Sequence, residues 1–232
     1  MGLDISVGIY GWFDDEDQDD EDPDYDPTNG VRVELENVNA LLEIAGLPLH
    51  HEPEDIAGTG REWYGRIGRW GAIHALRGFA AHIALTGEIP VEADDLSAPH
   101  FAGPYQADVM TDGITLIHPG RSKVGSWFDH LILHADSEGF YVPVDFPDVL
   151  CNVPVGMLGS SYRLLEECDL LARYLDIPPD LPMEDDPLSD AIGELKDATT
   201  TWQRFSWETW ACQNLRQGAR KSIAAGAALV FS

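Results

Sequence analysis

Ten acidic residues lie within the thirteen positions from 14 to 26, and this run constrains the fold more than any other feature of the sequence. Carboxylates at this density repel one another, and the run has almost no apolar side chains with which to build a core. We therefore expect a mobile, solvated loop over residues 14–28, and we call residues 14–26 the acidic segment. The core must form from the chain on either side of it.

The whole chain is strongly acidic, because 41 Asp and Glu residues outnumber 14 Lys and Arg residues and give a net charge of −27 over 232 residues. A field of this sign disfavours direct binding to DNA, RNA or anionic lipid, since phosphate contacts require basic side chains. Apolar residues still make up 44% of the chain, which is more than disordered acidic chains carry. The sequence therefore predicts a folded, soluble protein with no nucleic-acid or membrane partner.

Hydrophobic periodicity divides the rest of the chain into strands and helices. Alternating apolar residues predict strands near residues 3–10, 114–117, 127–135, 140–146 and 227–231. Apolar residues at helical spacing predict helices over residues 31–45, 61–86, 161–175 and 189–225, the last with a break at residues 199–201. The turn residues 136–139 should join two of the strands into an antiparallel hairpin.

These elements indicate an α+β fold, in which a small mixed, mostly antiparallel sheet is packed by about four helices on one face. We expect one domain over residues 1–232, with a Pro-rich acidic connection at residues 178–190. Three widely spaced cysteines suggest reduced thiols, and the first residues match neither a secretory signal nor a membrane span. We therefore expect a cytoplasmic protein, and the sequence leaves its oligomeric state open.

One group of residues suggests catalysis. On an extended strand, His130 and His134 would point to the same face, and Asp136 would follow them in the turn. With Asp145 on the returning strand, His134 and Asp136 could form the acid–base or metal centre of a small hydrolase. His118 is an alternative third ligand for a metal held by His134 and Asp136. The competing interpretation is a polar sheet face whose turn carboxylate caps its own backbone.

Two loops match parts of metal-binding patterns. Asp22, Asp24, Asp26 and Thr28 occupy positions one, three, five and seven of a calcium loop, but the glycine at position six and the glutamate at position twelve are missing. The other loop contains His50, His51, Glu52, Glu54 and Asp55. Acidic sequences supply such spacings by chance, and we expect neither a metal nor a cofactor.

A short basic stretch opposes the global charge. Arg66, Arg69 and Arg77 fall on one face of the helix expected over residues 61–86, with aromatic residues interleaved. Such a face can bind an anion or a nucleotide and stack against its base. The alternative is a counterion stripe that pairs with the protein's own carboxylates, and the large excess of acidic residues favours it.

The charge, together with the lack of a recognised catalytic motif, favours a non-catalytic binding protein. We expect an acidic inhibitor, immunity-type or nucleic-acid-mimic protein that occludes a basic partner such as a toxin or a nuclease. A row of carboxylates can imitate a phosphate backbone. The alternatives are the small hydrolase described above and a housekeeping protein of a high-salt cytoplasm. The residues expected to contact the partner are Asp14, Asp15, Glu16, Asp17, Asp19, Asp20, Glu21, Asp22, Asp24 and Asp26.

Overall fold

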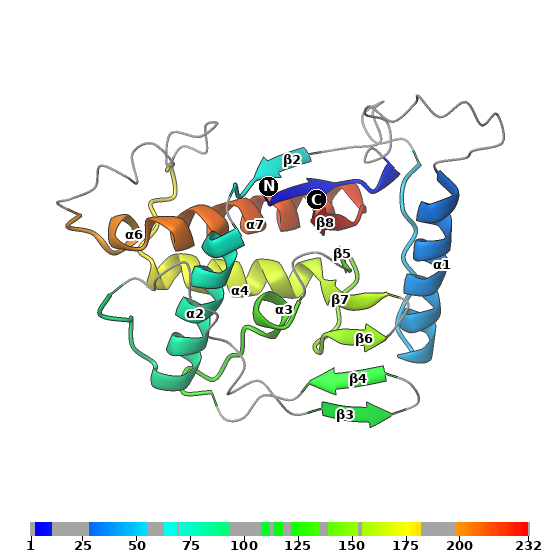
Figure 1. Cartoon of the computed structure of the whole chain (residues 1–232), viewed down its shortest axis with the longest axis horizontal. Helices are drawn as coiled ribbons and strands as arrows, with labels where there is room; N and C mark the ends of the chain where they lie inside the picture. Colours follow the sequence, from blue (N-terminus) through cyan, green and yellow to red (C-terminus); the bar gives the residue numbers. More distant parts are fainter. Residues whose placement is uncertain are drawn as a thin grey trace.

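The computed structural model describes residues 3–10, 28–54, 63–68, 70–92, 108–111, 114–117, 122–134, 139–152, 155–181 and 198–231 (Figure 1). These residues form six helices and two sheets, and the predicted α+β class is confirmed. The helices are α1 (Thr28–Ile44), α2 (Trp70–Thr86), α3 (Asp129–Ile132), α4 (Ser161–Tyr174), α6 (Thr201–Arg204) and α7 (Ser206–Ala225). No helix among the described residues is long and apolar enough to cross a membrane.

The larger sheet has six strands in the order β2-β1-β8-β5-β7-β6. Its strands are β1 (Asp4–Val7), β2 (Trp63–Arg66), β5 (Phe140–Val142), β6 (Leu150–Asn152), β7 (Gly156–Ser160) and β8 (Leu229–Phe231). Every neighbouring pair is antiparallel except β5 and β7, which run parallel. A second sheet consists of the antiparallel pair β3 (Asp108–Thr111) and β4 (Ile114–Ile117).

Hydrophobic clusters form on both faces of the larger sheet. Successive residues of β8 divide between them, since Leu229 belongs to one cluster and Val230 to the other. The first cluster joins the sheet to α2, α4 and α7, and the second joins it to α1 through Val38, Leu41 and Leu42. In Figure 1, α1 stands to the right of the strands and α2, α3 and α4 lie to their left. The expectation that helices would cover only one face was therefore wrong.

The predicted strand over residues 127–135 was also wrong. This part of the chain contains the short helix α3, and the predicted hairpin does not form, because β5 pairs with β7 and β8 instead. Phe128, Leu131 and Ile132 are all buried, and their spacing of three and four residues is typical of a helical turn, whereas a strand would place Leu131 on the opposite face. The Glu167 carboxylate accepts the N–H groups of His130 and Leu131, and this favours the helical turn.

The helix predicted over residues 61–86 begins later than expected. Residues 63–66 form β2, which pairs with β1 along its whole length, and α2 starts at Trp70. Gly68 separates the two elements with a φ of +81°, a left-handed conformation that glycine adopts without steric cost. The apolar spacing of α2 continues backwards into β2, so periodicity alone missed this boundary.

Other predicted elements are confirmed with small shifts. The helix over residues 31–45 corresponds to α1, and the helix over residues 161–175 corresponds to α4 with Ser160 as its N-cap. Residues 189–197 of the last predicted helix, and residues 182–190 of the predicted Pro-rich connection, lie outside the described part of the chain. A capping box of Thr200 and Gln203 starts α6. The strands β6 and β7 were not predicted. In β7, a Cβ atom on Gly159 would lie 2.4 Å from the Tyr141 ring, so only glycine fits there.

Candidate protein-binding surface

The acidic segment lies outside the described residues, but its two points of attachment are defined. The chain leaves the described structure at Tyr10, just after β1, and returns at Thr28, the first residue of α1. The chain leaves the described structure again after Glu54 and returns at Trp63. Trp63 pairs with Val7, at the same end of β1. The acidic segment and residues 55–62 are therefore attached to the same end of the β1–β2 pair.

A buried carboxylate fixes the backbone at this end. The side chain of Glu52 is fully buried, and its two oxygens accept the N–H groups of Ile9 at 2.9 Å and Ala228 at 2.7 Å. The Nε2 atom of His50 lies 2.6 Å from the same carboxylate. Asn39 of α1 in turn exchanges two hydrogen bonds with the backbone of His50. This network connects α1, β1 and β8 beside the attachment points of the acidic segment.

The net charge is divided unevenly between the described residues and the rest of the chain. The described residues hold 18 acidic and 10 basic side chains, which gives a net charge of −8. The remaining residues hold 23 acidic and 4 basic side chains, which gives −19. Most of the net charge that can attract a basic partner therefore belongs to residues outside the described part of the chain.

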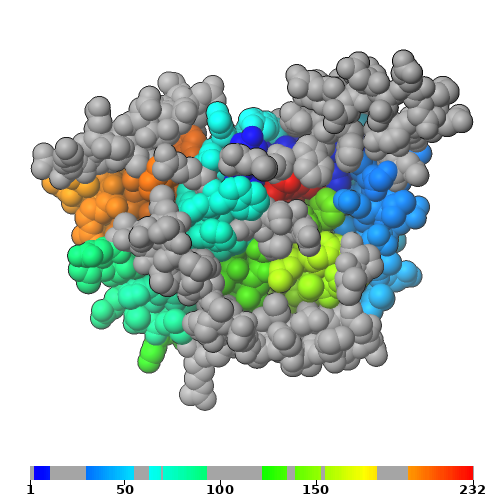
Figure 2. Space-filling model, in the orientation of Figure 1, coloured from blue at the N-terminus to red at the C-terminus, as the bar shows by residue number. Residues whose placement is uncertain are grey.

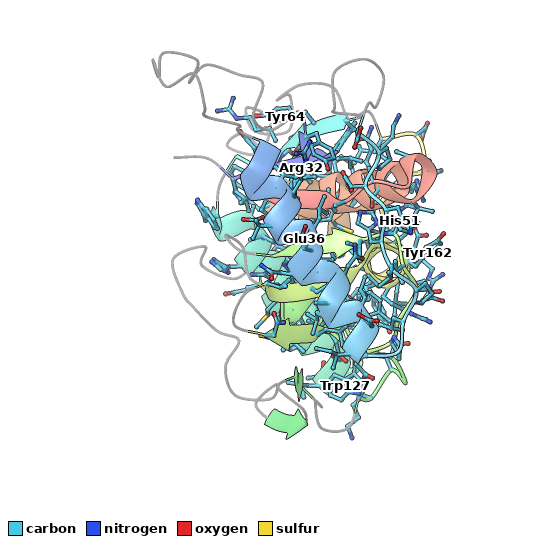
Figure 3. All side chains as sticks on the ribbon, turned by 90° about the vertical axis from the view of Figure 1, so that its right-hand side faces the viewer. Arg32, Glu36, His51, Tyr64, Trp127 and Tyr162 are labelled. Atoms are coloured by element: carbon cyan, nitrogen blue, oxygen red, sulfur yellow. The ribbon has the colours of Figure 1, made fainter. Side chains whose placement is uncertain are left out.

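Helix α1 adds exposed charge next to the acidic segment. Glu34, Glu36 and Glu43 are exposed, with Arg32 as the basic residue of this helix. Figure 3 shows Arg32 and Glu36 on the outer side of α1, one turn apart. Partial desolvation by neighbouring groups nevertheless raises the pKa of Glu34. In the space-filling view, α1 (blue) occupies one end of the molecule, and α6 and the start of α7 (orange) occupy the other (Figure 2).

The structure gives His134 a structural position. It is buried, its ring is stacked on Tyr141 at 3.9 Å, and its Nε2 atom lies 3.0 Å from the carbonyl oxygen of Phe140. Asp145 is exposed and forms an ion pair with Arg163 at 2.8 Å. Because residues 129–132 are helical, the predicted alignment of His130 and His134 on one strand face was wrong. Asp136 and His118 lie outside the described residues.

The candidate metal loops lie partly outside the described residues. Within the described part of the chain, no group of three or more His, Cys, Asp or Glu side chains is arranged to hold a metal ion. His50 and Glu52 instead form the network described above, and His51 and Glu54 are exposed. Residues 22–26 of the calcium-like pattern, and Asp55 of the second loop, lie outside the described residues.

The predicted arginine face does not form. Arg66 is the last residue of β2, Arg69 lies outside the described residues, and Arg77 is buried in α2. The guanidinium of Arg77 donates to the carbonyl oxygens of Leu131 at 2.8 Å and His134 at 2.5 Å. Arg66 and Arg77 therefore share no helix face, and Arg77 holds α3 and the residues after it against α2.

Sequence reasoning missed a group of polar residues between α3 and α4. Glu167 is almost fully buried, and burial raises its pKa well above the usual range. Burial raises the pKa of Asp129 to about 7, and the nearby Asp148 carboxylate adds to this effect. Burial also lowers the pKa of His130 to about 4. One signal was available, because Glu167 lies three residues after Leu164 and four before Leu171, on the apolar stripe of α4.

Comparisons with known proteins identify one family. No curated protein and no solved structure matches the chain. The family described as "Putative DNA-mimic protein" matches residues 1–231, which is nearly the whole sequence. This description agrees with an acidic chain whose charge is concentrated in segments joined to a folded core. The chain belongs to this family of DNA-mimic proteins.

Proposed function

We propose that the chain occupies the DNA-binding surface of a basic protein, such as a nuclease or a toxin, and thereby inhibits it. Membership of the family supports a DNA-mimic, non-catalytic binding function, and it suggests a DNA-binding protein as the partner. A protein that binds DNA through Lys and Arg side chains presents a positive surface. A chain with a net charge of −27 complements such a surface and is drawn to it over long range.

The observation that carries this proposal is the location of the charge. Ten carboxylates in the thirteen positions of the acidic segment approach the charge density of a phosphate backbone, which carries one charge per about 3.4 Å of each strand. The Glu52 network holds the backbone just before this segment, and α1 begins just after it. We propose that the acidic segment makes the first contacts with the partner and that α1 supplies further carboxylates.

The cellular location is part of the same proposal. Cys151, Cys168 and Cys212 are all free thiols, as expected in a reducing compartment. Cys168 and Cys212 are fully buried, and a side-chain hydrogen bond with Cys212, together with burial, raises the pKa of the Cys168 thiol. Such thiols are unreactive packing groups. We propose that the protein acts in the cytoplasm, where DNA-binding partners are found.

The test is capture of DNA-binding proteins on immobilised native chain at about 50 mM salt, a concentration at which screening is weak. We expect basic proteins to be retained and then released both by higher salt and by duplex DNA at constant salt. Release by DNA is the decisive part, because any acidic surface releases basic proteins when salt is added. Retained proteins that duplex DNA does not displace would contradict the proposal.

A further inference from the structure

A cavity of about 250 Å³ lies between α3 and α4. Its rim includes the exposed residues Ser126, Pro147 and Glu166, and its floor includes the buried residues His130 and Glu167. Its walls are completed by Trp127, Asp129, Arg163 and Leu170. The cavity therefore combines apolar walls, one of them aromatic, with three carboxylates.

Most polar groups of the cavity already have partners within the protein. The Glu167 carboxylate accepts two backbone N–H groups, and Arg163 pairs with Glu166 at 2.9 Å and with Asp145 at 2.8 Å. His130 is neutral near pH 7, because its pKa is lowered to about 4. Its Nδ1 atom accepts the N–H of Ser160, which leaves the proton on Nε2, facing the carbonyl oxygen of Pro147 at 3.2 Å.

Asp129 is an exception, and so is the Nε atom of Arg163, which lies 2.8 Å from the Asp145 carboxylate as an ion pair but makes no hydrogen bond. The Oδ1 atom of Asp129 is buried and has no hydrogen-bond partner within the described residues. The charged groups around it are the carboxylates of Asp148, Glu166 and Glu167 and the guanidinium of Arg163, which is already engaged by two carboxylates. An acceptor with no donor costs free energy when it is buried, and an ionised carboxylate costs more than a neutral group. Among the described residues that line the cavity, Arg163 is the basic side chain, and because its charge is taken up by Asp145 and Glu166, Asp129 is left without a cation of its own.

We propose that this cavity binds a guanidinium group, supplied by an arginine side chain of the DNA-binding partner. The proposal rests on the proposed function and adds a defined contact to it. Arginine is the residue with which DNA-binding proteins most often reach phosphates and guanine. Its planar guanidinium can donate to two carboxylates at once, here Asp129 and Glu166, and it stacks well on an aromatic wall such as Trp127. A lysine ammonium has neither the paired N–H donors that bind two carboxylates nor a planar face that stacks on an aromatic ring.

The free energy lost on ionising Asp129 makes a bound cation favourable. The carboxyl titrates near pH 7 in the free protein, so it is largely protonated at pH 6 and largely ionised at pH 8. A cation binds the ionised form, and the fraction in that form rises about tenfold between these two pH values. The affinity for a guanidinium ligand should rise by up to the same factor, while His130 stays neutral throughout.

The test is an NMR titration of the full chain with methylguanidinium chloride, with sodium chloride at equal concentrations as the reference. The probes are the indole N–H of Trp127 and the backbone N–H groups of His130 and Leu131. We expect saturable shifts that are confined to these groups and an affinity about tenfold higher at pH 8 than at pH 6. Shifts that do not saturate, or that sodium chloride reproduces, would overturn the proposal.

Three variants sharpen this test. Asp129→Asn should weaken methylguanidinium binding by about tenfold at pH 8 and abolish its pH dependence. Glu166→Gln, at an exposed rim position, should also weaken binding without disturbing the fold, whereas Glu36→Gln on α1 removes the same charge and should have no effect. Equal affinity in all three variants would count against the cavity.

Two further comparisons identify the source of the cation and separate this proposal from the previous one. A blocked Gly-Arg-Gly peptide should bind at least as tightly as methylguanidinium, and tighter binding of spermidine would refute the assignment to arginine. If the immobilised Asp129→Asn chain retains the same basic proteins as the native chain, and duplex DNA displaces them equally, the proposed function stands and the cavity has no part in it. If the native chain binds the peptide saturably but retains no proteins that duplex DNA displaces, the cavity assignment stands and the proposed function fails.

Discussion

The carboxylate of Glu52 accepts a hydrogen bond from the backbone N–H of Ile9, 43 residues earlier in the chain, at 2.9 Å. Ile9 precedes the acidic segment, and Glu52 precedes residues 55–62, a second stretch outside the described part of the chain. One buried side chain therefore fixes the backbone beside both stretches, and through Ala228 it also fixes the start of the C-terminal strand. The network therefore lies close to the point at which the acidic segment leaves the described structure.

Replacing Glu52 with Gln should destabilise the protein. The amide would present an N–H₂ group to one of the N–H donors of Ile9 and Ala228, and a buried donor without an acceptor costs about 1–3 kcal/mol. Chemical denaturation measures the free energy of unfolding. Glu54→Gln is the matched control, because Glu54 is exposed two residues away and its substitution should change little. Equal effects of the two substitutions would show that the network contributes no stability.

Arg77 should contribute to stability rather than to anion binding. Arg77→Met removes both donors to the carbonyl oxygens of Leu131 and His134, and the expected loss is about 2–3 kcal/mol in the free energy of unfolding. Arg173→Met, on an exposed part of α4, serves as the control and should change stability by less than about 0.5 kcal/mol. A stable Arg77→Met variant that had lost an anion-dependent rise in Tm would instead support an anion site.

Asp129 should make stability depend on pH. Its pKa is about 7 in the folded protein and near 3.8 in the unfolded chain, so the folded state holds the proton more tightly. The stability that this group contributes is fully present below about pH 4 and is lost as the pH rises through about 7. Asp129→Asn cannot lose a proton, and at pH 8 it should exceed the native stability by about 1–2 kcal/mol, a value reduced for partial solvent screening.

Thermal unfolding of the Asp129→Asn variant between pH 4 and pH 8 checks this expectation. The gain over the native chain should shrink to nothing towards pH 4. Asp180→Asn, at an exposed position after α4, should follow the native curve at every pH. A constant difference between the Asp129→Asn and native curves would mean that Asp129 does not titrate in this range. A buried acid that lowers stability at neutral pH is typical of residues retained for binding.

The acidic segment should govern the rate of association with the partner. Neutralising Asp14, Asp15, Asp17 and Asp19 to Asn should slow association by about tenfold at low salt and make its salt dependence shallower. The matched control neutralises Glu88, Glu92, Asp176 and Asp180, four exposed residues after α2 and α4. Stopped-flow or surface-based kinetics measure both variants. Equal slowing would show that total charge, rather than its location, determines the rate.

The sequence predicted the elements whose periodicity is unambiguous. In α1 and α4 the apolar stripe is unambiguous, and these helices are where the pattern places them. The strand predicted over residues 127–135 does not form, because Phe128, Leu131 and Ile132 pack at helical spacing and a carboxylate from α4, which no local pattern contains, stabilises the turn. The boundary at Gly68 was missed because apolar spacing continues across it.

The candidate site divides in the same way. The charge and its concentration before α1 can be read directly from the sequence, and they led to the DNA-mimic hypothesis that the family supports. The cavity between α3 and α4 could not be predicted, because Asp129 and Glu167 are 38 positions apart and meet only through the packing of two helices. The predicted grouping of His134 with Asp145 relied on a hairpin that does not form.

The most direct test of DNA mimicry is competition with DNA for one binding surface. A DNA-binding protein recovered by the capture experiment is bound to fluorescently labelled duplex, and anisotropy is followed as native chain is added at constant ionic strength. We expect the native chain to displace the duplex completely. Its apparent affinity for the DNA-binding protein should fall in proportion to the duplex concentration. A ternary complex, in which the anisotropy stays high while the chain binds the same protein, would contradict the account.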